Sequence, residues 1–233
     1  ILNYYDAKAF EQALLPTSRL RMHALVELRP REGWGHETPR AFAAILTPNR
    51  ILAFILGESY QAELSACCFI PVSRGGLRAS DKELARLLTK KSVRAAVIGY
   101  QGLGRTQAVC RAAQRAFACI LEFDLAVFAE TEPSIDVLRT HFSTMLREIR
   151  LRHALLVIRL ADMHEEAEKY CSRNAHIIRE MLNEDELLKF CIVSERQIAF
   201  TRKLFGELTE IICPQPDKDC QYIYWKKKKK KYI

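Results

Sequence analysis

The sequence has no long apolar run and no paired-cysteine motif. None of its hydrophobic stretches approaches the roughly 20 residues that a membrane span requires, and no signal-peptide pattern opens it. Eight cysteines are present, but none forms a C-x-x-C pair and most lie inside apolar runs. This pattern argues against a disulfide framework and a zinc site. It favours reduced thiols in a cytoplasmic protein that does not bind membranes.

Positive charge is concentrated in one short segment. Of the formal net charge of +8, six charges belong to the lysine-rich tail 226–233, which leaves +2 for the rest of the chain. A single run of lysines is more often a solvated tail than a binding surface, so nucleic acid is not the expected partner. The remaining composition is that of an ordinary globular protein, and 233 residues suffice for one large or two small domains.

The most informative motif is the glycine-rich stretch 99–106, Gly-Tyr-Gln-Gly-Leu-Gly-Arg-Thr. It follows the apolar run 95–98 and precedes 107–117, where apolar residues recur at helical spacing. The stretch fits the P-loop pattern G-x-x-x-x-G-K-[ST] except that Arg105 replaces the lysine. Backbone N–H groups of such a turn can surround phosphate oxygens, and the threonine hydroxyl can ligate Mg²⁺. The predicted nucleotide-binding residues are Gly99, Gly102, Leu103, Gly104, Arg105, Thr106 and Gln107, with Thr106 also as the metal ligand.

The same residues are also compatible with a glycine-rich β–α turn that binds no ligand, so this alternative stays open. Arginine keeps the positive charge of the lysine but presents a wider, planar group. Nucleotide can still bind to such a turn, whereas the geometry for hydrolysis is altered.

From about residue 81, predicted strands alternate with predicted helices. This alternation predicts an α/β core over 81–225, with a parallel five-stranded sheet and helices on both faces. Residues 1–75 are predicted to form a small, mainly helical, winged-helix-like domain, with helical character to about residue 70. The expected strands are 93–98, 119–124, 154–158, 190–194 and 209–213, and the expected helices are 5–15, 19–28, 48–57, 81–89, 107–117, one opened by Pro133, and 165–182.

Residues 93–225 resemble the α/β core of an AAA+ ATPase. Residues 15–20 and 46–57 are similar to the winged-helix segment before the AAA+ modules of certain bacterial ATPases. In those proteins a degenerate first module often precedes a competent second one. The resemblance implies the N-terminal part of an oligomeric ATPase that binds ATP or ADP with Mg²⁺ and remodels protein complexes. It also implies other AAA+ subunits or a downstream AAA+ module as partners. The matches follow the family's order: the glycine motif, Ile120–Leu125, His153–Asp162 at the Walker B strand, Cys191–Ser194 at the sensor strand, and Phe205–Asp217.

The chain departs from the family at the positions that carry catalysis. A working Walker B strand ends in Asp-Glu, but the corresponding positions hold Arg159 and Leu160, and the sensor asparagine position holds Glu195. Together with Arg105, these changes predict a module that binds nucleotide weakly or only structurally and does not hydrolyse it. No catalytic residue is therefore assigned.

Two alternatives remain open. In the first, the chain is an active ATPase in which Asp162 is the metal-side carboxylate, with Glu165 or Glu166 behind it. In the second, it is a DNA-binding winged-helix protein with a relict ATPase fold. The arginines that would contact DNA are Arg19, Arg21, Arg29, Arg31, Arg40 and Arg50.

Overall fold

The computed structural model describes residues 4–15, 18–22, 25–29, 44–57, 64–72, 77, 79–100, 102–160, 163–183, 187–195 and 198–213. The chain divides into two compact units, one of residues 1–65 and 134–152 and the other of residues 66–133 and 153–233. Within the described residues, no helix combines the length and the apolar character needed to cross a membrane. The lysine-rich tail 226–233 lies outside these residues, as do Arg31 and Arg40.

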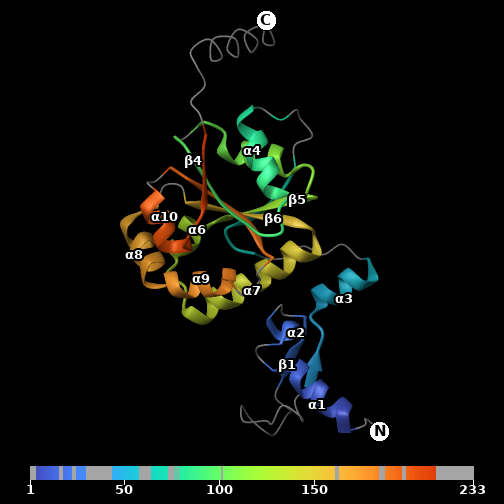
Figure 1. Cartoon of the computed structure of the whole chain (residues 1–233). Helices are drawn as coiled ribbons and strands as arrows, with labels where there is room; N and C mark the ends of the chain where they lie inside the picture. The colour runs from blue at the N-terminus through green and yellow to red at the C-terminus, as the bar shows by residue number, and fades with distance from the viewer. Residues whose placement is uncertain are drawn as a thin grey trace, which may run out of the picture. The chain divides into compact units, whose positions relative to one another are not determined.

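The second unit contains a six-stranded sheet in the order β3-β5-β6-β7-β4-β8 (Figure 1). Five strands are parallel, in the alternation with helices that the sequence predicts, and the arrangement is consistent with a P-loop-like fold. The sixth strand, β3, pairs antiparallel with β5 at one edge. The strands are β3 (Cys67–Pro71), β4 (Val93–Ile98), β5 (Cys119–Asp124), β6 (Ala154–Leu160), β7 (Lys189–Ser194) and β8 (Thr209–Ile212).

The predictions of helical character to residue 70 and of a five-stranded sheet are therefore wrong at β3. A short apolar run cannot be assigned to strand or helix by periodicity. Pairing with β5, which lies about 50 residues further along the chain, decides the conformation of β3.

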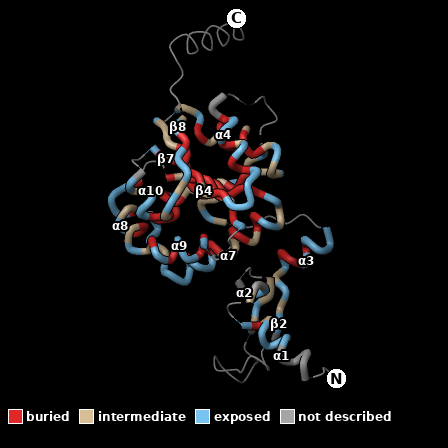
Figure 2. Tube along the Cα trace, viewed as in Figure 1, coloured by how far each residue is buried: buried red, intermediate tan, exposed pale blue. Residues whose placement is uncertain are grey.

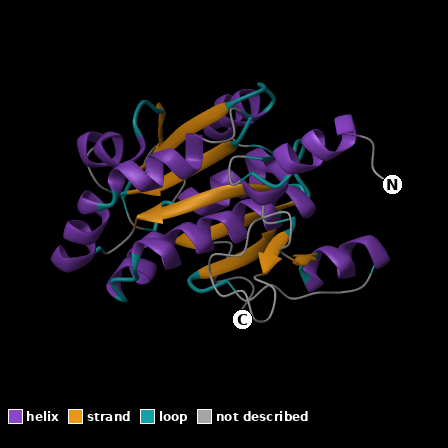
Figure 3. Ribbon diagram, turned by 90° about the horizontal axis from the view of Figure 1, so that it is seen from below, coloured by secondary structure: helices purple, strands orange, loops and turns teal. Residues whose placement is uncertain are grey.

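Helices cover both faces of this sheet (Figures 1 and 3). On one face α4 and α5 pack together, and α5 contacts β4, β5 and β7. On the other face α6 contacts β6, α10 contacts β4, and α8 and α9 lie beside them. The predicted helix 165–182 is two helices, because the chain breaks at Asn174. The helices are α4 (Ala79–Leu88), α5 (Arg105–Ala113), α6 (Leu125–Glu130), α8 (Glu165–Arg173), α9 (Ala175–Asn183) and α10 (Ile198–Phe205).

Alternation along the strands sends successive side chains to opposite faces. On the α5 face, Ala95 and Val97 of β4 join a buried apolar cluster with Val109 of α5. On the opposite face, Phe123 contacts Phe128 of α6, and Phe190 contacts Phe205 of α10. Figure 2 shows buried residues along the central strands of this sheet and also in the helices.

The first unit holds α1 (Tyr4–Ala13), α2 (Arg19–Met22), β1 (Glu27–Arg29), β2 (Ala44–Leu46), α3 (Asn49–Leu56) and α7 (Ile135–Leu151). The predicted helix 19–28 is wrong at its end, because 27–29 pair antiparallel with β2. Inside this unit, Arg50 of α3 donates from Nε to both carboxylate oxygens of buried Glu148 on α7, at 2.8 and 3.0 Å. Arg50 therefore lies in a buried ion pair, and the winged-helix assignment stays a prediction.

Candidate functional site

The glycine turn joins β4 to α5, as the sequence predicts. The backbone holds its start between two strands, because Gly99 N–H donates to Ser194 of β7 at 3.3 Å and Cys213 N–H donates to Ile98 at 2.7 Å. Its end is Gly104, which has a φ of +74° and directly precedes the first helical residue, Arg105. Glycine suits this left-handed conformation because a side chain would be strained there.

The start of the turn also has no room for a side chain. A Cβ atom on Gly99 would lie 3.0 Å from Cβ of Cys213 and 3.3 Å from Cδ1 of Leu103. The motif glycine at position 99 is therefore explained by close packing of the turn against the end of β8. This reason is independent of any ligand.

The turn lies between two neighbouring strands whose following connections run in opposite directions along the sheet. The chain leaves β4 through α5 toward β5 on one side, and it leaves the neighbouring strand β7 through α10 toward β8 on the other. These two connections run over opposite faces of the sheet. In open α/β sheets, ligands bind beyond the carboxyl ends of the strands at such a point. The fold thus places the glycine turn and Glu195, which follows β7, at the position where a ligand is expected.

The side chain of Arg105 is engaged by the protein itself. Its Nη1 donates to the Gly99 carbonyl at 2.7 Å, and its Nη2 donates to Oε1 of Glu195 at 2.6 Å. The Arg105 side chain is only 8% exposed, whereas that of Glu195 is 30% exposed. The guanidinium therefore connects the turn to the end of β7, two parts of the chain that are about 90 residues apart in sequence.

A second arginine lies at the end of β6 and is also paired with carboxylates. Nε of Arg159 lies 3.4 Å from Oδ2 of Asp124, and its Nη1 lies 3.8 Å from Oε1 of Glu122. Burial raises the pKa of the Glu122 carboxyl, while nearby Arg159 lowers it and Asp124 raises it. Asp124 additionally accepts a hydrogen bond from Val127 N–H at the start of α6. Arg159 thus has two acidic neighbours on β5, and the next residue, Leu160, is fully buried.

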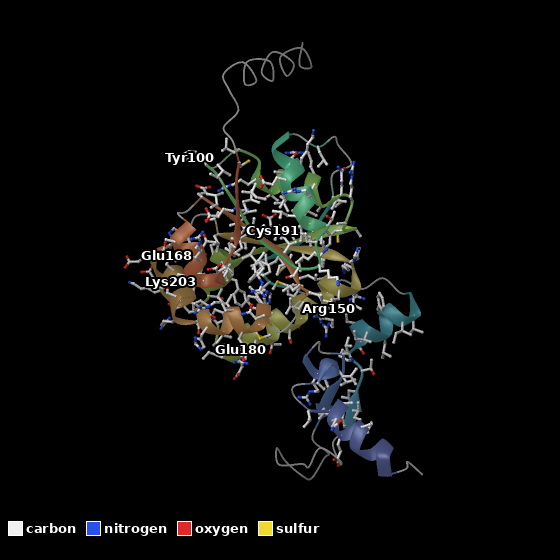
Figure 4. All side chains as sticks on the ribbon, viewed as in Figure 1. Tyr100, Arg150, Glu168, Glu180, Cys191 and Lys203 are labelled. Carbon is white, nitrogen blue, oxygen red and sulfur yellow. The ribbon has the colours of Figure 1, made fainter. Side chains whose placement is uncertain are left out.

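The two arginines line one cavity of about 270 Å³. Its lining residues come from the glycine turn, the first turn of α5 and the ends of β6 and β7. Strand alternation puts the four charged residues on the α5 face of the sheet: Glu122, Asp124, Arg159 and Glu195. Tyr100, labelled in Figure 4 beyond the end of β4, is largely exposed, whereas Cys191 lies within the sheet. The lining residues are Gly102, Gly104, Arg105, Thr106, Gln107, Arg159, Val193 and Glu195.

Five of the seven predicted nucleotide-binding residues therefore line the cavity. The other two, Gly99 and Leu103, do not line it, although the Gly99 carbonyl holds Arg105. Sequence reasoning identified Arg159 and Glu195 only as departures from a family pattern, and it missed Glu122 and Asp124. The available signal was the pair of carboxylates spaced by two residues at the end of a predicted strand.

The side chains around the cavity do not fit Mg²⁺. Thr106 lines it, but the carboxylates nearby are already paired with arginine. Across the part of the chain that the structure describes, no three His, Cys, Asp or Glu side chains are grouped so that they could hold a metal ion. Asp162, the alternative metal-side carboxylate, lies outside the described residues, and exposed Glu165 pairs with Lys169 at 2.7 Å.

No protein-family model and no curated protein matches the sequence. The structure is similar to that of Saccharomyces cerevisiae RIF2 at 11% sequence identity, with a TM-score of 0.43 and coverage of 66% of this chain and 62% of that one. It is similar to C. elegans PCH-2 at 12% identity, again with a TM-score of 0.43, over 72% of this chain and 55% of that one. The chain thus spans less than two thirds of either protein. At TM-scores below 0.5, neither likeness establishes a family or a function.

Proposed function

We propose that this chain is a P-loop-like module of the AAA+ type that binds ATP or ADP at the glycine turn and does not hydrolyse it. The proposal that the chain does not hydrolyse ATP rests on the two residues at the end of β6. In the resembled family, a metal-binding aspartate and a water-activating glutamate stand there. This chain has Arg159, a cation, and Leu160, a buried side chain with no polar atom. Neither residue can hold a metal ion or polarise water.

Phosphate binding is supported by the hydrogen-bond donors around the cavity. The first N–H groups of a helix have no partner within the helix, and no side chain caps the start of α5. The helix dipole adds partial positive charge at this end. Arg105 and Arg159 line the same cavity, so a polyphosphate there could contact two guanidinium groups, each of which is paired with carboxylates in the ligand-free chain.

The proposed role is assembly or regulation beside a competent AAA+ ATPase that remodels protein complexes. This role rests on the resemblance in sequence to degenerate first modules, because a fold by itself does not define a function. Nucleotide bound without turnover would stabilise the folded module and the surfaces that it presents to neighbouring subunits.

The test is ATP binding and ATP turnover by the purified chain, measured with and without Mg²⁺. We expect saturable binding of ATP or ADP and no turnover above the protein-free rate. Mg²⁺-dependent turnover that Thr106→Ala abolishes would show the proposal to be wrong. Loss of such turnover in Asp162→Asn would favour the active-ATPase alternative instead.

A further inference from the structure

The carboxylate of Glu195 lies at the cavity beside the glycine turn. Glu195 makes the charge-assisted contact to Arg105 that a phosphate oxygen would make in a P-loop-like site. Because the guanidinium is almost fully buried and also donates to the Gly99 carbonyl, its orientation is set by these two acceptors. A ligand phosphate that binds Arg105 at Nη2 must therefore approach the position of the Glu195 carboxylate.

The ion pairs of Arg159 affect whether the site can hold a metal ion. Nucleoside polyphosphates usually reach proteins with Mg²⁺, which neutralises the phosphate oxygens and is itself held by carboxylates. Here the guanidinium of Arg159 lies against the carboxylates of Glu122 and Asp124 and is 43% exposed toward the cavity side of the sheet. Because this guanidinium pairs with both carboxylates, they are not free to hold Mg²⁺. Its exposed part can contact phosphate oxygens directly, since guanidinium binds phosphate in a bidentate manner.

We propose that the glycine turn binds a diphosphate or triphosphate group without a divalent cation, and that Glu195 is an internal competitor that must leave Arg105 before the phosphate binds. The inference rests on the proposed nucleotide-binding function and specifies the chemical state of its ligand. In the ligand-free chain, the Arg105–Glu195 pair closes the site. In the bound chain, a phosphate oxygen replaces the Glu195 carboxylate on Arg105, and Arg159 takes the place of the metal ion.

The test is isothermal titration of the full chain with ADP and with pyrophosphate, each in EDTA and in Mg²⁺. Glu195→Gln removes the competing charge at nearly constant size, and we expect it to bind ADP in EDTA about tenfold more tightly than the wild type, the ratio that corresponds to about 1.4 kcal/mol. Glu210→Gln is the matched control, because Glu210 pairs with Arg202 outside the cavity, and its affinity should equal that of the wild type. Arg159→Gln should weaken binding in EDTA.

Each outcome bears on a different part of the inference. Tighter binding by Glu195→Gln in EDTA, with Glu210→Gln unchanged, supports it. Pyrophosphate that binds as tightly as ADP shows that the site recognises the phosphates rather than the nucleoside, which also supports it. Binding that requires Mg²⁺, or equal affinities of Glu195→Gln and the wild type, overturns the inference and leaves nucleotide binding intact. If neither ligand binds any variant at millimolar concentration, the proposed function fails together with the inference.

If Glu195→Gln does not fold, the wild-type chain still decides the question. The inference then requires that ADP binds in EDTA at least as tightly as in Mg²⁺. Weaker binding in EDTA than in Mg²⁺ would overturn it.

Discussion

Replacement of Arg105 and Glu195 by alanine, singly and together, measures how strongly the glycine turn depends on their ion pair. Ion pairs between exposed side chains contribute about 0.2–1 kcal/mol. Hydrogen bonds to charged groups contribute about 1.5–3 kcal/mol. Arg105 is 8% exposed and Glu195 is 30% exposed, so the pair falls between these two cases. We expect a coupling free energy of about 1.5 kcal/mol from the double-mutant cycle.

The single substitutions should differ in size. Arg105→Ala removes both hydrogen bonds of the guanidinium and leaves the Gly99 carbonyl without this donor, so we expect a loss of about 3 kcal/mol of unfolding free energy. Glu195→Ala leaves the Gly99 contact in place, and we expect a loss of about 2 kcal/mol because a buried guanidinium loses its counter-ion. Arg105→Lys should fall between the wild type and Arg105→Ala, since a single ammonium group cannot reproduce the planar fork.

Native-state hydrogen exchange of the amides in β4 and β7 is the suitable assay. The chain has two compact units and need not unfold in one step, whereas exchange reports the stability of these strands directly. The Arg202–Glu210 pair, with side chains 56% and 33% exposed, provides a control cycle in which we expect a coupling below about 1 kcal/mol. A coupling at Arg105–Glu195 no larger than the control would refute the reasoning, because the pair would then be screened by solvent.

Three further predictions concern packing, a buried charge and pH. Gly99→Ala should lower the free energy of unfolding, measured by hydrogen exchange of β4, by about 1–3 kcal/mol. The reason is that the added Cβ atom would lie 3.0 Å from Cβ of Cys213. Unchanged exchange would contradict this. Glu148→Ala should lower the free energy of unfolding, measured by hydrogen exchange of α7, by about 3 kcal/mol, and Glu148→Gln should lower it less. The reason is that the fully buried carboxylate accepts hydrogen bonds from Arg50 and Arg152. Equal stability of both variants and the wild type would contradict this. Burial raises the pKa values of the Cys171 and Cys191 thiols from 9.0 to about 12, so only the unfolded chain ionises them between these values. The urea midpoint of the unit that holds both thiols should therefore fall as the pH rises above 9, and less steeply in Cys191→Ala. A midpoint that rises would contradict this.

Local residue patterns were enough to predict the parallel part of the fold. Strand β5 has the predicted bounds 119–124, and β4, β6, β7 and β8 lie within two residues of their predicted ends. Apolar runs carry most of this information, because β4, β6 and β7 are buried on both faces. The glycine turn was equally readable, since its position between a strand and a helix follows from adjacent residues.

Elements whose conformation depends on distant partners were not readable in this way. Strand β3 exists because it pairs with β5, and residues 27–29 form a strand because they pair with β2. The long helix predicted over 165–182 breaks at Asn174, whose Nδ2 donates to the Tyr170 carbonyl. Local periodicity and residue propensity do not predict these contacts, so tertiary structure overrides the local pattern.

The glycine turn itself shows the same division. Its sequence determined a strand, a tight turn and a helix, with a cationic residue in place of the expected lysine. Only the tertiary structure decided what that cation does, because Gly99, Arg105 and Glu195 meet where β4 and β7 end side by side. An ion pair between residues about 90 positions apart depends on strand order, and strand order is set by packing of the whole sheet.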